Sequence, residues 1–237
     1  MRVYVSYLRT RAAFILMYAL ASPWISSCFL VRLILNMQEA VRTYPLVSTD
    51  GTTSVSEEEF RYQTTFATSI FSTLSVAPGH VHVALVEYSE FPTAIYGDAS
   101  FFVDSAARAT GLANSAVPSL RGTAAGRALA YVAEKISING RPGVPSAVVF
   151  LMDGSSQDDV REGAEALHAL GTTVYAIGLG PSANFEQLEI IAGTDSGSLL
   201  QPSVAFDQFD GALVTDNLVA DLCSSETQEE CTKCRNR

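Results

Sequence analysis

Apolar segments of strand length alternate with amphipathic helical segments along most of this chain, and this alternation restricts the fold more than any other feature. Residues 81–88, 148–152 and 174–179 are nearly continuous apolar runs, typical of strands buried on both faces of a sheet. Strands separated by helices predict right-handed crossovers. The pattern therefore predicts an α/β fold: a Rossmann-like, doubly wound, mostly parallel central sheet with helices on both faces. Thr93–Tyr96 follows a hairpin and predicts one short antiparallel edge strand.

The first central strand is predicted at Tyr44–Thr49, although its sequence is unusual for a buried strand. Pro45 has no amide hydrogen for the sheet, and Ser48 and Thr49 are polar where apolar side chains are expected. The other elements follow from capping residues and apolar spacing. Helices are expected to begin at Ser56, Thr123 and Asp158 and to span 100–110, 184–192 and 207–222, with a loop at 111–121 and an edge strand at 198–200.

The composition fits one globular domain with a terminal extension. The 237 residues are 48% apolar and 17% charged, which is enough apolar material for a sizeable core. The net charge is −10 and the domain contains no basic run. These two features argue against a nucleic-acid partner, because phosphate-binding surfaces concentrate Lys and Arg.

The amino-terminal segment differs from the rest of the chain. Arg2, Arg9 and Arg11 precede an uncharged run at 12–31, whose most apolar part ends in Ala19-Leu20-Ala21. This pattern predicts a secretory signal peptide at 1–21, with an uncleaved membrane anchor at 12–31 as the alternative. In both interpretations the domain is exported, as a secreted protein or on the outside of a membrane. The apolar leader at 22–43 remains unassigned.

The cysteines lie outside the predicted core, at positions 28, 223, 231 and 234. Cys231 and Cys234 have the spacing of half a zinc site, but no second pair or nearby histidine completes one. In an exported protein, disulfides at the flanks of the domain are the favoured interpretation, and four cysteines allow three pairings. Residues 224–237 form a cysteine-containing tail after the domain.

Hard oxygen donors follow two of the predicted strands and open one of the predicted helices. Asp50-Gly51-Thr52-Thr53-Ser54 comes directly after the first strand, and Asp153 ends the strand at 148–152. Thr123 stands where a helix begins. Because ligands of such sheets bind beyond the carboxyl ends of the strands, these residues are expected at one edge. Hard oxygens with only two carboxylates suit Mg²⁺ better than a soft metal.

In their order and spacing these residues resemble the metal-ion-dependent adhesion site of the von Willebrand factor A domain family. The resemblance covers roughly residues 44–223 and rests on these segments: 50–55, 83–89, 122–123, 126–129, 153–154 and 174–180. It implies that Mg²⁺, or alternatively Mn²⁺ or Ca²⁺, is held by Asp50, Thr52, Ser54, Thr123 and Asp153, with the hydroxyls coordinating directly and one or both carboxylates acting through water. Thr52 stands where the family usually has serine.

The resemblance also implies a function. An acidic residue of a matrix or cell-surface protein would complete the coordination of the ion, so the chain is expected to be a non-enzymatic, extracellular adhesion domain. Both carboxylates are expected on surface loops, where truncation to alanine would leave the fold nearly intact.

Two alternatives remain open. The first is a structural interaction domain of the same fold that works without metal. The second is a metal-dependent, phosphatase-like hydrolase, because Ser48-Thr49-Asp50-Gly51-Thr52 resembles the nucleophile loop of haloacid-dehalogenase-type phosphatases. Ser48 replaces the nucleophilic aspartate of that loop, and no base to activate it is evident.

Overall fold

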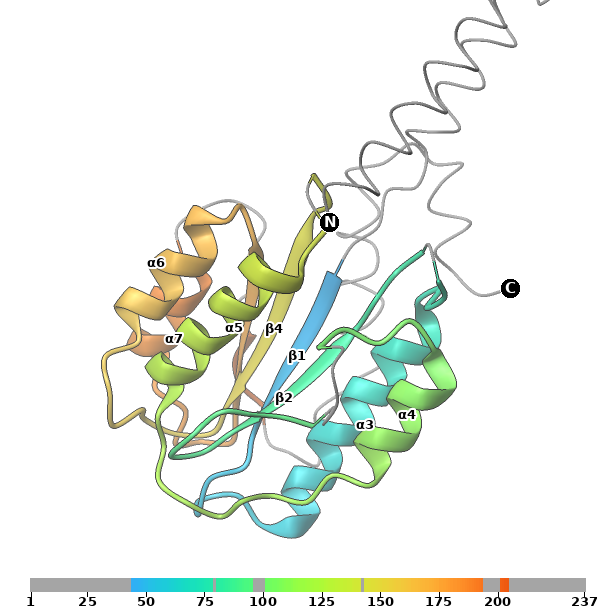
Figure 1. Ribbon diagram of the computed structural model, residues 1–237. Coiled ribbons are helices and arrows are strands. Elements are labelled where there is room, and N and C mark those ends of the chain that lie inside the picture. Colours follow the sequence, from blue (N-terminus) through green and yellow to red (C-terminus); the bar gives the residue numbers. More distant parts are fainter. Residues whose placement is uncertain (1–43, 79, 96–100, 142, 194–200, 205–237) are drawn as a thin grey trace, which may run out of the picture. The chain divides into compact units, whose positions relative to one another are not determined.

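The computed structural model describes residues 44–78, 80–95, 101–141, 143–193 and the backbone of 201–204. Within these residues the strands form one six-stranded sheet in the order β3-β2-β1-β4-β5-β6 (Figure 1). The strands are β1 (Tyr44–Asp50), β2 (Ala84–Tyr88), β3 (Thr93–Ala94), β4 (Ser146–Met152), β5 (Thr173–Leu179) and β6 (Gln201–Val204). Every pairing is parallel except that of β2 with β3, which is antiparallel. The predicted sheet with one antiparallel edge strand is confirmed.

Strand β1 lies at the centre of the sheet despite its polar residues and its proline. Pro45 is in register with Ala147 of β4, whereas pairing with β2 begins only at Leu46. A proline near the start of a strand is tolerated because few ladder bonds need its missing amide hydrogen there. Thr49 satisfies its hydroxyl by donating to the Val86 carbonyl at 3.3 Å. The polar end of β1 therefore belongs to the interior.

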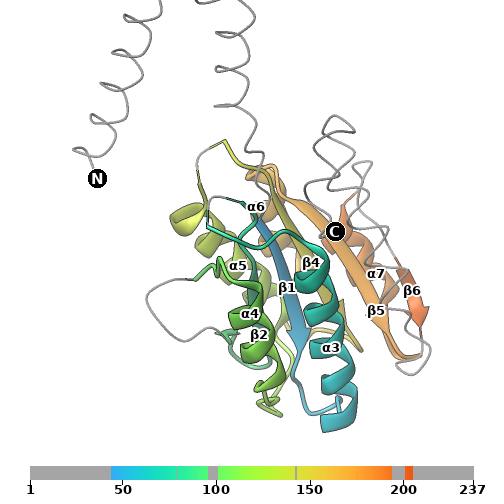
Figure 2. The same cartoon turned by 90° about the vertical axis from the view of Figure 1, so that its right-hand side faces the viewer.

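The helices form two layers, one on each face of the sheet. They are α3 (Glu57–Thr73), α4 (Ala106–Asn114), α5 (Ala125–Asn139), α6 (Arg161–Ala169) and α7 (Phe185–Ala192). Figures 1 and 2 show α3 packed beside α4 on one face, and α5, α6 and α7 on the other. The core between them is built from both helix layers and the sheet, with Phe71, Leu85, Leu129, Phe150 and Ile177 fully buried. The doubly wound architecture predicted from the sequence is thus present.

Helix α4 is displaced from its predicted position. It was expected at 100–110 with a loop from 111, but it begins at Ala106 and continues to Asn114. The reason lies in the preceding residues, because Val103 exchanges two backbone hydrogen bonds with Val83, at 2.8 and 2.9 Å, and is therefore extended. Ser105 then caps the helix by accepting from the Arg108 amide.

Other boundaries agree more closely with the prediction. Ser56 is the N-cap of α3 and forms a capping box with Glu59. Helix α5 starts at Ala125 rather than at Thr123. Helix α6 starts at Arg161, not at Asp158, because the Asp158 carboxylate caps α5 instead.

Several predictions fall on residues that the structure does not describe. These are the leader at 1–43, the strand at 198–200, the helix at 207–222, the tail at 224–237 and all four cysteines. Among the described residues, no helix combines the length and apolar character needed to cross a bilayer.

Candidate metal site

The main chain of Asp50, at the end of β1, is held on both sides by one glutamine of α3. The Asp50 amide donates to the Gln63 Oε1 atom at 2.7 Å, and the Gln63 Nε2 atom donates to the Asp50 carbonyl at 3.0 Å. Gln63 is buried although it is polar. Two opposed hydrogen bonds fix the position at which the chain leaves the sheet, and so they orient the loop that follows.

The carboxylate of Asp50 connects three separate segments. Its Oδ1 atom accepts from the Thr52 amide at 3.1 Å. Its Oδ2 atom accepts from the Tyr88 hydroxyl at 2.9 Å and from the Asp153 amide at 3.2 Å. The Tyr88 hydroxyl also lies 2.9 Å from the Leu151 carbonyl oxygen. The end of β2 and the end of β4 therefore meet at one carboxylate on β1.

The hydroxyls of the Asp50 loop are brought together by the turn. Thr52 Oγ1 and Ser54 Oγ lie 2.7 Å apart, with Thr52 buried and Ser54 exposed to solvent. The main chain makes this turn tight, because the Val55 amide donates to the Thr52 carbonyl at 3.2 Å. The two hydroxyls thus form a pair of neutral donors beside the carboxylate.

Thr123 lies between the other two loops. The preceding residues pair with the Asp50 loop, because the Leu120 amide donates to the Gly51 carbonyl and the Thr53 amide donates to the Arg121 carbonyl. On the far side, the Gln157 amide donates to the Thr123 carbonyl at 2.9 Å. These bonds bring the backbone of all five predicted residues to one edge of the sheet.

Asp153 supplies the least satisfied polar atom of the site. The residue is 7% exposed, and its Oδ1 atom has no hydrogen-bond partner among the described residues. Burial first, and then the charge of Asp153, raise the pKa of Asp50 from its ordinary 3.8 to about 7. Two buried carboxylates with an unpaired oxygen fit a divalent cation, since a positive charge relieves both the repulsion and the lost hydration.

The expectation that both carboxylates lie on surface loops is wrong. Asp50 is fully buried, and its carboxylate accepts three hydrogen bonds from residues on three segments. The strand end is covered because α3, β2 and β4 all converge on it. Replacing Asp50 by alanine would therefore remove structural bonds as well as a metal ligand.

The donor set is of the hard type. In the described ranges, no group of three or more His, Cys, Asp or Glu side chains is placed to hold a metal. A cation at this edge would depend on the two carboxylates and on the hydroxyls of Thr52, Ser54 and Thr123. Hydroxyl and carboxylate oxygens are the ligands of Mg²⁺, Mn²⁺ and Ca²⁺ rather than of soft metals.

Sequence reasoning missed the residues that hold these loops. Glu87 is buried on β2, and its carboxylate accepts from the Ser119 amide at 3.1 Å and from the Ser119 hydroxyl at 2.8 Å. A Cβ atom at Gly51 would overlap the Glu87 side chain, so any larger residue at this position would force Glu87 to move. Two features of the sequence could have pointed to these residues. Glu87 is a charged residue within an apolar run, and Gln63 lies three residues before Phe66, on the apolar face of its helix.

The start of α5 is capped by the loop that carries Asp153. The Ala125 amide donates to the Ser156 hydroxyl at 2.8 Å, and the Gly126 and Arg127 amides donate to the Asp158 carboxylate at 2.9 and 2.8 Å. Helix α5 has no cap from its own N-cap residue, Ala124. The Thr123 and Asp153 loops are therefore joined through a helix cap that connects residues about thirty positions apart.

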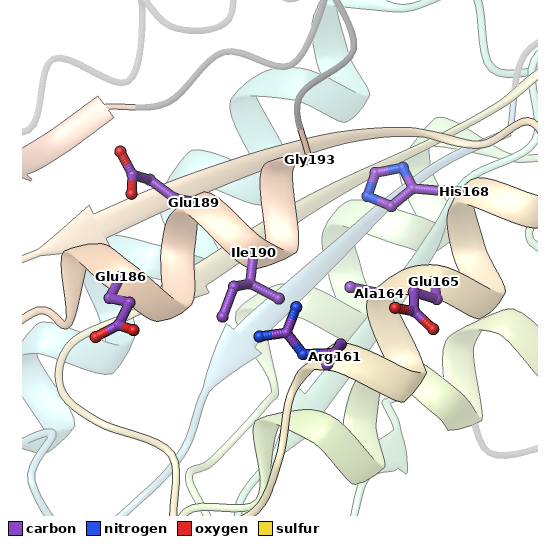
Figure 3. Close-up of a pocket in the computed structure, with 8 residues that line it drawn as sticks. All are labelled: Arg161, Ala164, Glu165, His168, Glu186, Glu189, Ile190 and Gly193. Carbon is purple, nitrogen blue, oxygen red and sulfur yellow. The ribbon is translucent and has the colours of Figure 1, made fainter.

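A separate hollow lies between α6 and α7. It has a volume of about 520 Å³, and Figure 3 shows Arg161, Glu165, Glu186 and Glu189 among its lining side chains. None of the predicted site residues lines it. Its charges are mixed and its residues belong to no group that could hold a metal, so it carries no part of the site.

Comparison with known proteins identifies the family of this domain. A family model described as the von Willebrand factor type A domain matches residues 47–213. Cuticlin-6 of Caenorhabditis elegans is 30% identical over 185 residues, which are 75% of this chain and 30% of that protein. Matrilin-1 of Gallus gallus is 32% identical over 149 residues, which are 60% of this chain and 29% of that protein. The chain thus spans about a third of the length of these relatives.

Solved structures agree with the fold. Proximal thread matrix protein 1 from the mussel byssus matches with a TM-score of 0.65 at 22% identity, over 75% of this chain and 48% of that one. A second structure of the same protein is described with zinc in its metal-ion-dependent adhesion site (MIDAS) motif. It matches with a TM-score of 0.62 at 19% identity, over 76% of this chain and 45% of that one. From the family model that covers most of its length, the chain belongs to the von Willebrand factor type A domain family.

Proposed function

We propose that this chain is an extracellular, non-enzymatic domain that binds an acidic residue of a matrix or cell-surface protein through a Mg²⁺ ion. The ion would be held by Asp50, Thr52, Ser54, Thr123 and Asp153. The observation that carries the proposal is the buried, unpaired Oδ1 atom of Asp153 beside the Asp50 carboxylate. An unpaired buried oxygen of this kind is costly unless a ligand satisfies it.

The residues of the site divide into positioning groups and ligands. Gln63 holds the main chain of Asp50, and Tyr88 orients its carboxylate. The hydroxyls of Thr52 and Ser54 add neutral oxygens that do not cancel the charge of a cation. When bound, the ion supplies an electrophilic position for a carboxylate oxygen from outside.

The relatives support this assignment at a coarser level. A structural neighbour is named as a matrix protein and was described with zinc in its MIDAS motif. Zinc there shows that the motif of that protein accepts a divalent ion, while the hard oxygens of the present site favour Mg²⁺, with Mn²⁺ or Ca²⁺ as alternatives. An extracellular setting also agrees with the signal peptide predicted at 1–21, the leader at 22–43, the domain at 44–223 and the cysteine-containing tail at 224–237.

The phosphatase-like alternative finds little support. Ser48, which takes the place of the nucleophile in that resemblance, is fully buried in the central strand of the sheet. No hydrogen-bond partner for its hydroxyl occurs among the described residues, so no base activates it. The metal-independent interaction domain is the remaining alternative, and metal titration separates it from the proposal.

The test is a titration of the metal-depleted chain with Mn²⁺, followed by electron paramagnetic resonance, with Mg²⁺ as competitor. We expect one site in the wild-type chain, retained by Asp104→Asn and lost or strongly weakened in Asp153→Asn. Asp104 is an exposed acid before α4 and serves as the matched control. Acetate should then lower the water proton relaxation caused by bound Mn²⁺, because a carboxylate displaces water from the ion. An unchanged isotherm in Asp153→Asn would remove the site assignment.

A further inference from the structure

Exposed apolar side chains gather at the same edge of the sheet as the metal site. Seven large apolar side chains are exposed in the described residues: Tyr62, Phe91, Val117, Leu120, Ile138, Leu170 and Phe185. Four of these, here named the apolar rim, lie on loops or on a helix start next to the site: Phe91, Val117, Leu120 and Phe185. Scattered exposed apolar residues are ordinary, but several around one site mark a contact surface.

Hydrogen bonds connect the rim to the site loops. Leu120 donates its own amide to the Gly51 carbonyl at 2.9 Å. Phe91 lies two residues after Ser89, whose carbonyl accepts from the Ala124 amide at 2.9 Å. Phe185 follows Asn184, whose amide donates to the Gly154 carbonyl at 3.1 Å. Each of these rim residues is therefore within two positions of a bond to the Asp50, Thr123 or Asp153 loop.

Leu120 occupies a backbone conformation that leucine rarely adopts. Its φ is 52°, and it is the one residue other than glycine with a positive φ in the described part of the chain. The conformation is held from both sides, because Ser119 bonds to the Glu87 carboxylate and the Arg121 carbonyl accepts from Thr53. Glycine or asparagine would adopt it at lower cost. The strained backbone thus presents a half-exposed leucine side chain beside the metal loops.

Cationic side chains and a groove adjoin the rim. The Arg127 guanidinium lies 5.0 Å from the centre of the Phe91 ring and donates to the Glu90 carbonyl, whereas Arg121 lies 4.0 Å from the Glu90 carboxylate and is paired with it. Val117 lines a groove of about 280 Å³, whose other wall is formed by Phe60 and Arg61 of α3. The positive charge of Arg127 beside Phe91 therefore suits an acidic partner.

We infer that the apolar rim is a docking surface for a protein segment in which the metal-bound acidic residue is flanked by bulky apolar side chains. Leu120 is the specificity-determining contact, and the groove beside Val117 receives one flanking side chain. The inference rests on the proposed function, because the acidic residue is the one that completes the metal site. It adds the chemistry of the residues that flank this acidic residue in the partner, which are bulky and apolar.

The test uses a displayed peptide library with a fixed central glutamate and randomised neighbours, selected on the full chain in Mg²⁺. We expect Leu, Ile, Phe, Val or Met to be enriched next to the glutamate. Leu120→Asn should weaken the selected peptides roughly three- to tenfold, the factor expected for burying the exposed half of one leucine side chain. Leu170→Asn is the matched control, since Leu170 is equally exposed but follows α6 at the opposite edge. Asparagine tolerates a positive φ, so Leu120→Asn should keep the wild-type melting temperature or exceed it.

The outcomes separate the inference from the proposed function. Magnesium-dependent peptides without apolar neighbours, or peptides bound equally by wild type and Leu120→Asn, would overturn the apolar rim alone. Peptides that bind equally well in chelator would overturn the metal-dependent function, and a library without any magnesium-dependent binder would overturn both. If the chain instead forms a magnesium-dependent dimer that Leu120→Asn dissociates, the inferred foreign segment is wrong. The occupant of the apolar rim is then a second copy of this chain.

Discussion

At the scale of single residues, Asp50 is where burial and charge oppose one another. Its carboxylate is removed from water beside a second carboxylate, which is why its pKa is raised to about 7. Hydrogen bonds from Thr52, Tyr88 and Asp153 offset part of this cost. The ionised carboxylate of Asp50 therefore destabilises the folded state, and a proton or a cation can relieve this destabilisation. The free energy of unfolding should consequently depend on pH.

We predict that the metal-free chain loses stability as the pH rises from about 4 to about 7. In this range the folded state keeps a proton on Asp50 that the unfolded state has released, so the folded state binds more protons and the free energy of unfolding falls with pH. One such proton corresponds to a slope of about 1.4 kcal/mol per pH unit. Urea unfolding in chelator across this range measures it.

Asp50→Asn is the control for this prediction, since its amide does not titrate. The difference in unfolding free energy between wild type and Asp50→Asn should change with pH between about 4 and 7 and level off above the raised pKa. A difference that is independent of pH would show that Asp50 ionises normally in the folded state.

At the scale of helices and strands, the packing of α5 against α6 depends on glycine. A Cβ atom at Gly163 would lie 2.6 Å from the Gly126 carbonyl oxygen and 2.6 Å from the Leu129 Cβ atom. Such distances are well inside van der Waals contact, so the two helices touch through their backbones here. This close approach also brings the start of α5, and with it Thr123, against the loop that carries Asp158.

We predict opposite effects for alanine at two helical glycines. Gly163→Ala should destabilise the chain by about 1–3 kcal/mol, because the methyl group forces α5 and α6 apart. Gly111→Ala should stabilise it by roughly 0.5–1 kcal/mol, because Gly111 lies in α4 with nothing within 4 Å of the added atom and alanine favours a helix. Chemical denaturation of both variants measures the pair. Equal and small effects would mean that α5 and α6 can separate without cost.

At the scale of the whole domain, the site joins parts of the chain that are distant in sequence. Asp50 and Asp153 are 103 positions apart and meet because β1 and β4 are neighbours in the sheet. A ligand that binds all three loops stabilises the folded state by mass action. Metal binding should therefore affect the global stability as well as the local order of the loops.

We predict that Mg²⁺ at a hundred times its dissociation constant raises the free energy of unfolding by about 2.7 kcal/mol. Hydrogen exchange should slow in three segments at once, 50–55, 119–124 and 153–158. Segments at the opposite edge, such as 168–173, serve as the internal control and should exchange as before. Protection confined to one loop would mean that the ion does not join the three.

The order of the elements could be predicted from the sequence because it depends on local patterns. Continuous apolar runs must be buried on both faces, and alternation with helices then leaves a parallel, doubly wound sheet. The same pattern placed Asp50 and Asp153 at strand ends, since those residues directly follow apolar runs. Element boundaries were less certain, as α4 shows, because a single pairing between Val83 and Val103 displaced its start.

The tertiary structure alone decided how the candidate site is supported. The bonds of Gln63, Tyr88 and Glu87 depend on strand register and on where α3 meets the sheet, and no local pattern encodes either. Asp50 is buried because α3, β2 and β4 meet over the end of its strand. In the sequence this position appears only as a turn. Sequence patterns determine which surfaces must be buried, whereas contacts between distant residues exist only after those surfaces have packed.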